Sequence, residues 1–191
     1  WQKWDPTWLL GSQFTGKTLG MVGLGRIGTA VASRLKPFGF SRILYYGSRP
    51  HPERADSLGA EFTASFDELL SESDVICICC ALTNKTHHMF DRRAFQKMKP
   101  TAILVNSARG PIVHQDDLVS ALNAGEIGGV GTDVTDPEPI APDHPLVHHP
   151  RAVVFPHLGS ATEETRTLMA NMAIDNALAG IFGRPLRAPI N

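Results

Sequence analysis

A histidine and an arginine stand directly after stretches of sequence that are typical of buried strands. His157 follows the strand predicted over residues 152–155, and histidine is the usual proton donor near neutral pH. Arg109 follows the strand predicted over residues 102–106, where its guanidinium can bind a carboxylate through two parallel hydrogen bonds. These residue types predict acid–base chemistry beside a bound carboxylate. The alternative for each is a solvated surface side chain.

Two acids flank the turn after the strand predicted over residues 130–134. They are Asp133 and Glu138. A carboxylate beside an imidazole raises the imidazole pKa and fixes its tautomer. The residues alone leave open which of the two acids serves His157, and either could instead be a turn-forming or surface acid.

Three glycines lie between a predicted strand and a predicted helix. Gly23, Gly25 and Gly28 fit the pattern G-x-G-x-x-G. In this context the first glycine permits a tight turn, the second lets the backbone approach a pyrophosphate, and the third lets the helix pack closely. Arg26 and Ile27, which open the helix, are expected beside the same ligand. The alternative is a glycine-rich turn with no ligand.

The end of the second predicted strand indicates which dinucleotide binds. NAD-binding proteins carry an acid about 20 residues past the glycines, where it bonds the ribose 2′-hydroxyl. Here the nearest acid, Glu53, comes after two prolines. Arg49 can pair with a 2′-phosphate and Ser48 can donate to it. The sequence therefore favours NADP(H), with NAD(H) as the alternative cofactor and a solvated surface charge as the alternative for Arg49.

Cys77, Cys79 and Cys80 are interpreted as core packing within one strand. An odd number of cysteines this close together does not build a disulfide framework, so we expect a reducing compartment, the cytoplasm. The pair His148 and His149 has no further ligands at suitable spacing. No metal site is predicted.

The elements that must position these residues alternate between strands and helices. Strands are predicted over 18–22, 43–46, 60–63, 74–82, 102–106, 130–134 and 152–155, and helices over 26–35, 53–58, 91–98 and 115–123. Capping boxes at Ser65 and Ser160 predict two more helices, the second ending near residue 182. The fold class is α/β: a doubly wound parallel sheet (Rossmann-like) of about seven strands with helices on both faces.

The composition excludes several classes of protein. The 191 residues carry a net charge of −1, which argues against a strongly basic nucleic-acid binder. No apolar run approaches the roughly 18 residues of a membrane span. We therefore expect neither nucleic acid nor membrane as a partner.

Four motifs in this order and spacing resemble the D-isomer-specific 2-hydroxyacid dehydrogenases. They are residues 23–28, 106–110, 131–139 and 156–162. The resemblance covers nearly the whole chain and is nearest to the glyoxylate reductase/hydroxypyruvate reductase branch.

The resemblance implies a role for each strand-end residue. His157 would protonate the keto oxygen of a small 2-oxoacid, and Glu138 would keep the imidazole charged until transfer. Arg109 would bind the substrate carboxylate and polarise the carbonyl, with Ser160 as a further substrate contact. Hydride would pass from the nicotinamide to the keto carbon. The implied activity is NADPH-dependent reduction of glyoxylate or hydroxypyruvate.

The resemblance also implies contacts to the cofactor. Asp133 would hold the nicotinamide carboxamide. The remaining implied contacts are Ala81, Leu82, Thr83, Ser107 and Gly159.

Complete members of the family have a second, substrate domain built from both ends of the chain. Only about 17 residues precede the first predicted strand and about nine follow the last predicted helix. Residues 1–191 are therefore interpreted as the coenzyme domain, with the N-terminal substrate domain absent. We expect the chain to bind NADPH and to turn over poorly alone.

Family members dimerise through this domain, so a homodimer is expected. Trp1, Trp4 and Trp8 lie at helix-like spacing and are candidates for the dimer interface or for the chain's own core. Two other functions stay open. One is another D-2-hydroxyacid dehydrogenase, such as a phosphoglycerate type, and the other is a cofactor-sensing, corepressor-type binding protein on the same fold.

Overall fold

The computed structural model describes residues 4–7 and 10–189. The chain separates into two compact units, Trp1–Val154 and Phe155–Asn191, and each is described by itself. The interpretation of residues 1–191 as one coenzyme domain stays a prediction. Trp1 and Trp8 lie outside the described residues, and the side chain of Trp4 is 79% exposed.

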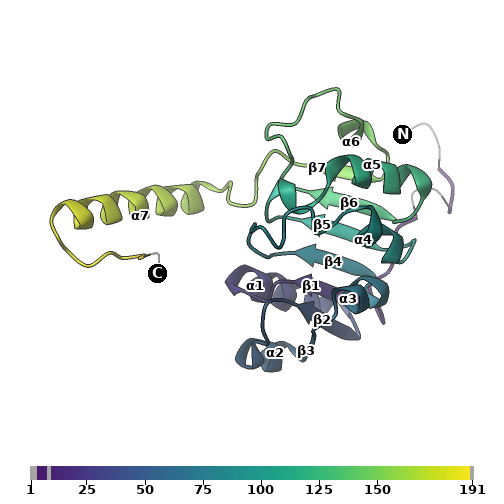
Figure 1. Cartoon of the computed structure of the whole chain (residues 1–191), viewed down its shortest axis with the longest axis horizontal. Helices are drawn as coiled ribbons and strands as arrows, with labels where there is room; N and C mark the ends of the chain where they lie inside the picture. Colours follow the sequence, from purple (N-terminus) through teal and green to yellow (C-terminus); the bar gives the residue numbers. More distant parts are fainter. Residues whose placement is uncertain (1–3, 8–9, 190–191) are drawn as a thin grey trace. The chain divides into compact units, whose positions relative to one another are not determined.

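Among the described residues of the first unit, seven strands form one parallel sheet. The strands are β1 (Thr18–Val22), β2 (Arg42–Tyr46), β3 (Ala60–Thr63), β4 (Val75–Ile78), β5 (Ile103–Asn106), β6 (Gly129–Thr132) and β7 (Ala152–Val154). Their order is β3-β2-β1-β4-β5-β6-β7 (Figure 1). The strand order reverses between β1 and β4, so the predicted doubly wound, Rossmann-like sheet is confirmed.

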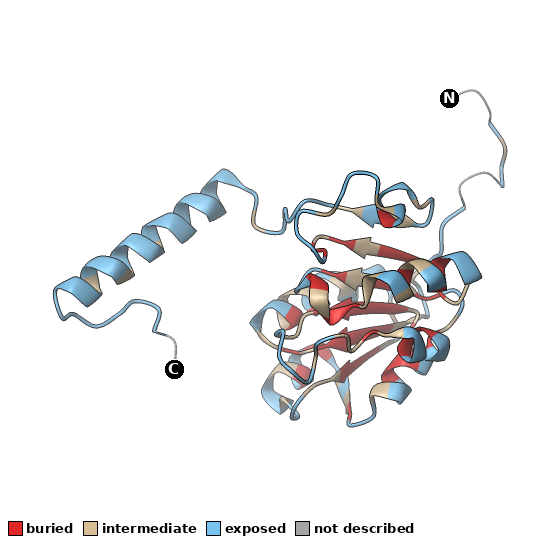
Figure 2. Cartoon of the chain, turned by 45° about the horizontal axis from the view of Figure 1, so that its top comes forward, coloured by how far each residue is buried: buried red, intermediate tan, exposed pale blue. Residues whose placement is uncertain are grey.

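Helices cover both faces of this sheet. They are α1 (Arg26–Leu35), η1 (Lys36–Phe38), α2 (Pro52–Leu58), α3 (Phe66–Glu72), α4 (Arg92–Lys97), η2 (Gly110–Ile112), α5 (Gln115–Ala124) and α6 (Pro145–His148). Alternate strand residues pack on opposite faces. Leu19 and Met21 of β1 join the core under α1 and α2, whereas Ile76 and Ile78 of β4 join the core under α3, α4 and α5. Figure 2 shows the buried residues concentrated in the sheet and on the inward sides of these helices.

Two predicted strands end at least two residues early in the structure. β4 ends at Ile78, although its apolar run continues to Leu82, because residues 79–82 leave the sheet and line the cavities described below. β6 ends at Thr132 because the Thr132 hydroxyl donates to the Val134 carbonyl oxygen at 2.5 Å. This local hydrogen bond stabilises the turn of the chain after the strand.

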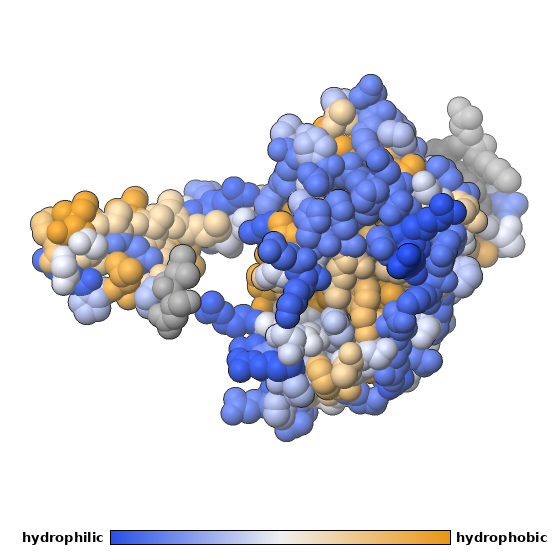
Figure 3. Space-filling model, in the orientation of Figure 1, coloured by the Kyte–Doolittle hydropathy of each residue, from blue (hydrophilic) through white to orange (hydrophobic). Residues whose placement is uncertain are grey.

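The second unit contains the helix α7 (Glu163–Ile181). The predicted capping box placed Ser160 at its N-terminus, which is wrong. Thr162 is the capping residue, since its hydroxyl accepts from the Thr165 N–H at 3.2 Å. Apolar side chains of α7 lie open to solvent (Figure 3), among them Leu168, Met169, Ile174, Leu178 and Ile181. None of the helices in the described part of the chain is both long enough and apolar enough to cross a membrane.

Candidate cofactor cleft and active site

The three glycines between β1 and α1 differ in what surrounds them. Gly23 has a φ of +94°, and a Cβ there would lie 2.9 Å from the Cys80 nitrogen. A Cβ on Gly28 would collide with the Gly23 carbonyl oxygen. Around Gly25 a Cβ would meet no described atom within 4 Å. The fold itself therefore requires Gly23 and Gly28, whereas the space in front of Gly25 is open to a ligand.

The N-terminus of α1 lies at this turn. Gly25 is the capping residue, and in the described chain no side chain caps the helix and no acid stands in its first turn. The Thr29 N–H and hydroxyl both donate to the Gly25 carbonyl oxygen, at 2.9 and 2.8 Å, and hold the first turn in shape. Unpaired N–H groups and the positive end of the helix dipole favour an anion such as a pyrophosphate here.

A cavity of about 360 Å³ opens beside the glycine turn. Its walls come from the glycine turn and from the segments that follow β2 and β4, and within the described chain none of its lining residues is acidic. Arg26 and Arg49 are exposed and lie outside this lining, so their cofactor contacts stay predictions. The predicted cofactor residues that line it are Gly23, Gly25, Ser48, Ala81 and Thr83.

A second cavity, of about 450 Å³, adjoins the first. The two share Cys79, Cys80 and Ala81, so they form one cleft along the carboxyl ends of the strands. The second cavity brings together four further residues of the prediction, Ile27, Leu82, Ser107 and Arg109. A cleft that begins beside β2 and ends at an arginine after β5 suits a dinucleotide with its reactive end near a carboxylate site.

Asn106 holds the turn that carries Arg109. Its side chain is 2% exposed. The Asn106 side-chain amide donates to the Arg109 carbonyl oxygen at 3.0 Å, and its own oxygen accepts from the Ala108 N–H at 3.0 Å. The Arg109 side chain is exposed on this fixed backbone. The sequence motifs did not predict this role for Asn106, although a polar residue at the end of a buried apolar strand was the available signal.

The segment after β6 packs directly against the Arg109 turn. A Cβ on Gly110 would collide with the Thr135 carbonyl oxygen, so the two backbones touch. The Asp133 N–H donates to the Asn106 carbonyl oxygen at 2.9 Å. The structure therefore brings Asp133, which is half-buried, beside the turn of Arg109.

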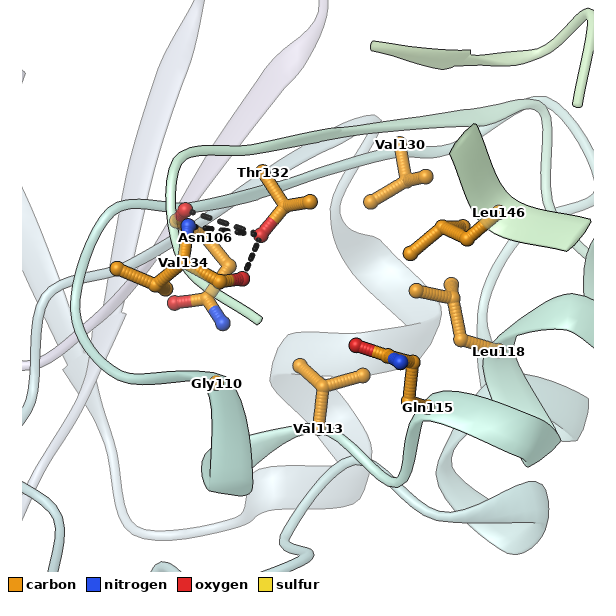
Figure 4. A pocket seen from close by; sticks show the side chains of 9 residues that line it. All are labelled: Asn106, Gly110, Val113, Gln115, Leu118, Val130, Thr132, Val134 and Leu146. Atoms are coloured by element: carbon orange, nitrogen blue, oxygen red, sulfur yellow. Dashed lines mark hydrogen bonds between the residues drawn. The ribbon is translucent and has the colours of Figure 1, made fainter. Parts of the chain in front are cut away.

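A small internal cavity lies behind this junction (Figure 4). Its volume is about 10 Å³, which leaves room for no more than about one water molecule. Apolar side chains of Val113, Leu118 and Leu146 line one side, and Thr132, bonded to Val134, lines the other. The tight packing restrains both segments that approach the cleft.

His157 belongs to the second unit, together with Gly159 and Ser160. It is exposed and has a φ of +55°, a backbone conformation that is uncommon for residues other than glycine and that clusters at functional sites. The Arg166 guanidinium donates to the carbonyl oxygens of His157 and Ser160, at 3.4 and 3.2 Å. Glu138 is exposed in the first unit, and its pairing with His157 stays a prediction.

Comparison with known families decides the classification. Residues 1–159 match the family model described as D-isomer specific 2-hydroxyacid dehydrogenase, NAD binding domain. The chain belongs to the D-isomer specific 2-hydroxyacid dehydrogenase family. The resemblance predicted from the four motifs is thereby confirmed. A nicotinamide dinucleotide fits the cleft, because the open space at Gly25 and the uncapped helix provide for its phosphates.

Individual members of the 2-hydroxyacid dehydrogenase family match most of the chain. The human glyoxylate reductase/hydroxypyruvate reductase is 48% identical over 186 residues, which are 97% of this chain and 56% of the relative. Glyoxylate/hydroxypyruvate reductase B of Escherichia fergusonii is 46% identical over 179 residues, 93% of this chain and 54% of the relative. The crystal structure of the TT0316 protein from Thermus thermophilus superposes with a TM-score of 0.91 at 46% identity, covering 100% of this chain and 59% of that one. The chain spans about half the length of the curated relatives it matches.

The cysteines have two locations in this dehydrogenase domain. Cys77 lies in the core as predicted, whereas Cys79 and Cys80 line both parts of the cleft, because they follow the end of β4. Burial, with a neighbouring thiol, raises the pKa of Cys77 to about 12 and that of Cys79 to about 11, and burial also raises the pKa of Cys80. All three thiols are therefore neutral at pH 7. The described residues contain no group of three or more side chains suited to holding a metal ion.

Proposed function

We propose that this chain is the coenzyme domain of an NADPH-dependent reductase that converts glyoxylate to glycolate and hydroxypyruvate to D-glycerate. The observation that carries the proposal is the continuous cleft from the glycine turn to Arg109. A dinucleotide bound in this cleft would lie beside the Arg109 guanidinium, which can bind the carboxylate of a 2-oxoacid. The names of the human and Escherichia fergusonii relatives support this substrate class.

Each functional side chain has its own role in the proposed reaction. Arg109 binds the substrate carboxylate and draws electron density from the neighbouring carbonyl. His157 donates a proton to the keto oxygen, and the Glu138 carboxylate favours the charged imidazole before transfer. When bound, the reduced nicotinamide supplies hydride to the keto carbon. Asp133 holds the nicotinamide carboxamide, and Ser160 adds a contact to the substrate.

The preference for NADPH is supported by the charges around the first cavity. Its lining, within the described chain, contains no carboxylate that would repel a 2′-phosphate. Ser48 lies on the lining and can donate to that phosphate. In the proposal Arg49, which is exposed on the same turn, adds positive charge from outside.

The proposal extends to the whole protein. A substrate domain outside this chain supplies the other wall of the active site, in keeping with the chain's coverage of about half of its relatives. A homodimer is supported by the open apolar side chains of α7, since such patches mark contact surfaces. The cytoplasm is supported by the free thiols of Cys77, Cys79 and Cys80.

The test titrates the chain with NADPH and with NADH and follows the nicotinamide fluorescence. We expect NADPH to bind at least about tenfold more tightly than NADH, a difference of about 1.4 kcal/mol. If neither NADPH nor NADH binds, the assignment as a coenzyme domain is overturned. Equal affinity for the two would overturn the proposed cofactor preference and leave the domain assignment in place.

A further inference from the structure

Two side chains that can carry positive charge lie on the lining of the first cavity. His51 belongs to the turn between β2 and α2, and Lys85 belongs to the segment after β4. β2 and β4 are the two neighbours of β1 in the sheet, so these cationic side chains come from both sides of the glycine turn. Ser48 lies on the same lining as His51. His51 and Ser48 follow β2, so they lie at the end of the cleft that is farthest along the sheet from Arg109, which follows β5.

The backbone of His51 is anchored to the core of the domain. Its N–H donates to the Tyr45 hydroxyl at 2.9 Å. Tyr45 is 1% exposed and its ring packs against Phe62 with 5.3 Å between the ring centroids. His51 is half-buried and lines the cavity, whereas Arg49 is exposed and outside the lining. His51 therefore has an anchored backbone at the cavity wall.

We infer that His51 binds the 2′-phosphate of NADPH and makes the choice between NADPH and NADH dependent on pH. The inference rests on the proposed NADPH-dependent function. An imidazolium donates a charge-assisted hydrogen bond to a phosphate, which is about twice as strong as a neutral one. A histidine loses this charge between about pH 5 and 8, whereas a lysine keeps its charge. NADH has no 2′-phosphate, so its binding does not use the charge.

Among the described residues, His51 is the one histidine on the cavity lining. The charged and titratable side chains on the surrounding elements are Arg42, Tyr45 and Tyr46 of β2, Arg49 of the turn, Glu53, Arg54 and Asp56 of α2, and Cys79, Cys80, Lys85, His87 and His88 in residues 79–89 after β4. His87 and His88 lie outside the lining. Arg54 donates to the Leu24 carbonyl oxygen at 3.0 Å, and Glu53 is exposed outside the lining. Tyrosine, lysine, arginine and glutamate side chains keep one charge state between about pH 6 and 8. The raised pKa values of the two thiols keep them neutral there.

The sign of the effect follows from two titrations. A phosphate monoester loses its second proton near pH 6, which strengthens its attraction to any cation. An imidazolium that loses its proton no longer donates a charge-assisted hydrogen bond, which weakens the pair. Above about pH 6.5 the phosphate is already a dianion, so the loss of imidazolium dominates and NADPH affinity falls as pH rises.

The experiment measures the dissociation constants of NADPH and NADH between pH 6.5 and 8.5 for the chain and three variants. In the unaltered chain we expect NADPH affinity to fall about tenfold over this range while NADH affinity changes little. His51→Arg, with a permanent charge, is expected to bind NADPH with little pH dependence and more tightly than the unaltered chain at pH 8.5. His51→Gln is expected to bind NADPH weakly with little pH dependence. His148→Gln is the matched control, since His148 is exposed and outside the cavity lining, and it is expected to keep the original slope.

The outcomes separate this inference from the proposed function. Preference for NADPH with the same pH slope in the unaltered chain and in His51→Gln would overturn the role of His51 alone. Absence of any preference for NADPH at pH 6.5 would overturn both the proposed cofactor preference and the inference. Thermal unfolding of each variant shows that it is folded. If His51→Gln does not fold, His51→Arg decides the inference, and a retained slope in that variant would overturn it.

Discussion

Arg109 reaches the cleft from a turn that Asn106 and Gly110 hold in place, so its guanidinium is displayed on a fixed backbone. Arg109→Ala is expected to lower kcat/KM for a 2-oxoacid by an amount equivalent to about 2–5 kcal/mol, because the substrate carboxylate loses its paired donors. Arg109→Lys keeps the positive charge but cannot form two parallel hydrogen bonds, so its kcat/KM should lie between those of the unaltered protein and Arg109→Ala. Steady-state kinetics on the complete protein measure this, and an unchanged kcat/KM in Arg109→Ala would remove Arg109 from the site.

Replacement of His157 should lower the rate of the chemical step without weakening NADPH binding. We expect His157→Gln to lower kcat by about 10²–10⁴ because the proton donor is lost. NADPH affinity should change little, since the glycine turn and the first cavity belong to the other unit. Kinetics and fluorescence titration on the same preparation give both values. Loss of NADPH binding would instead assign His157 a structural role.

At the scale of elements, the turn between β1 and α1 has separable structural and binding roles. Gly28→Ala should lower the free energy of unfolding by about 1–3 kcal/mol, because its Cβ would collide with the Gly23 carbonyl. The Cβ of Gly25→Ala would lie in open space, so this variant should lose less than about 1 kcal/mol of unfolding free energy, as is usual for alanine at a helix cap. It should nevertheless weaken NADPH binding at least about tenfold, because the methyl group occupies the phosphate space. Urea unfolding and titration measure the two effects, and full NADPH affinity in Gly25→Ala would contradict the phosphate site.

The start of β1 is tied to its neighbours through Asp74. Burial raises the pKa of this carboxyl, but the hydrogen bond from the Thr18 N–H at 2.9 Å and the ammonium groups of Lys99 and Lys17, at 3.2 and 3.7 Å, outweigh burial and lower it. A lowered pKa contributes stability above the unfolded-state value of about 3.9, and that stability is lost as pH falls through the folded-state value.

We therefore expect Asp74→Asn to lower the free energy of unfolding at pH 7, by about 1–3 kcal/mol. The difference from the unaltered chain should shrink as pH falls below about 4, because protonation removes the same charge. Urea unfolding between pH 3 and 7 measures the difference. A constant difference across that range would show that the charge of Asp74 contributes no stability.

Strand and helix positions were predictable where local pattern and long-range packing agree. The strand over residues 18–22 and the helix over 26–35 are confirmed to the residue. The end of β4 was not predictable from hydrophobicity. Residues 79–82 are apolar and line a cleft, and an apolar run of this kind is equally suited to a buried strand. The capping residue of α7 differs from the predicted one because serine and threonine are both good capping residues. The backbone path selects Thr162 in place of Ser160.

For the whole molecule, the order of the motifs along the chain is enough to indicate the family, because several motifs in sequence are more specific than one. The positioning role of Asn106 and the cavity contacts of His51 and Lys85 could not be predicted, since they depend on which side chains of distant turns share a wall. The cleft within the first unit contains Arg109, and the second unit contains His157, whose backbone has a φ of +55°.

The most direct test of the account is the oxidation of NADPH by the complete protein with hydroxypyruvate and with glyoxylate, compared with NADH under the same conditions. We expect rapid oxidation that depends on the 2-oxoacid and is much slower with NADH. Tight binding of NADPH without turnover of either acid would contradict it.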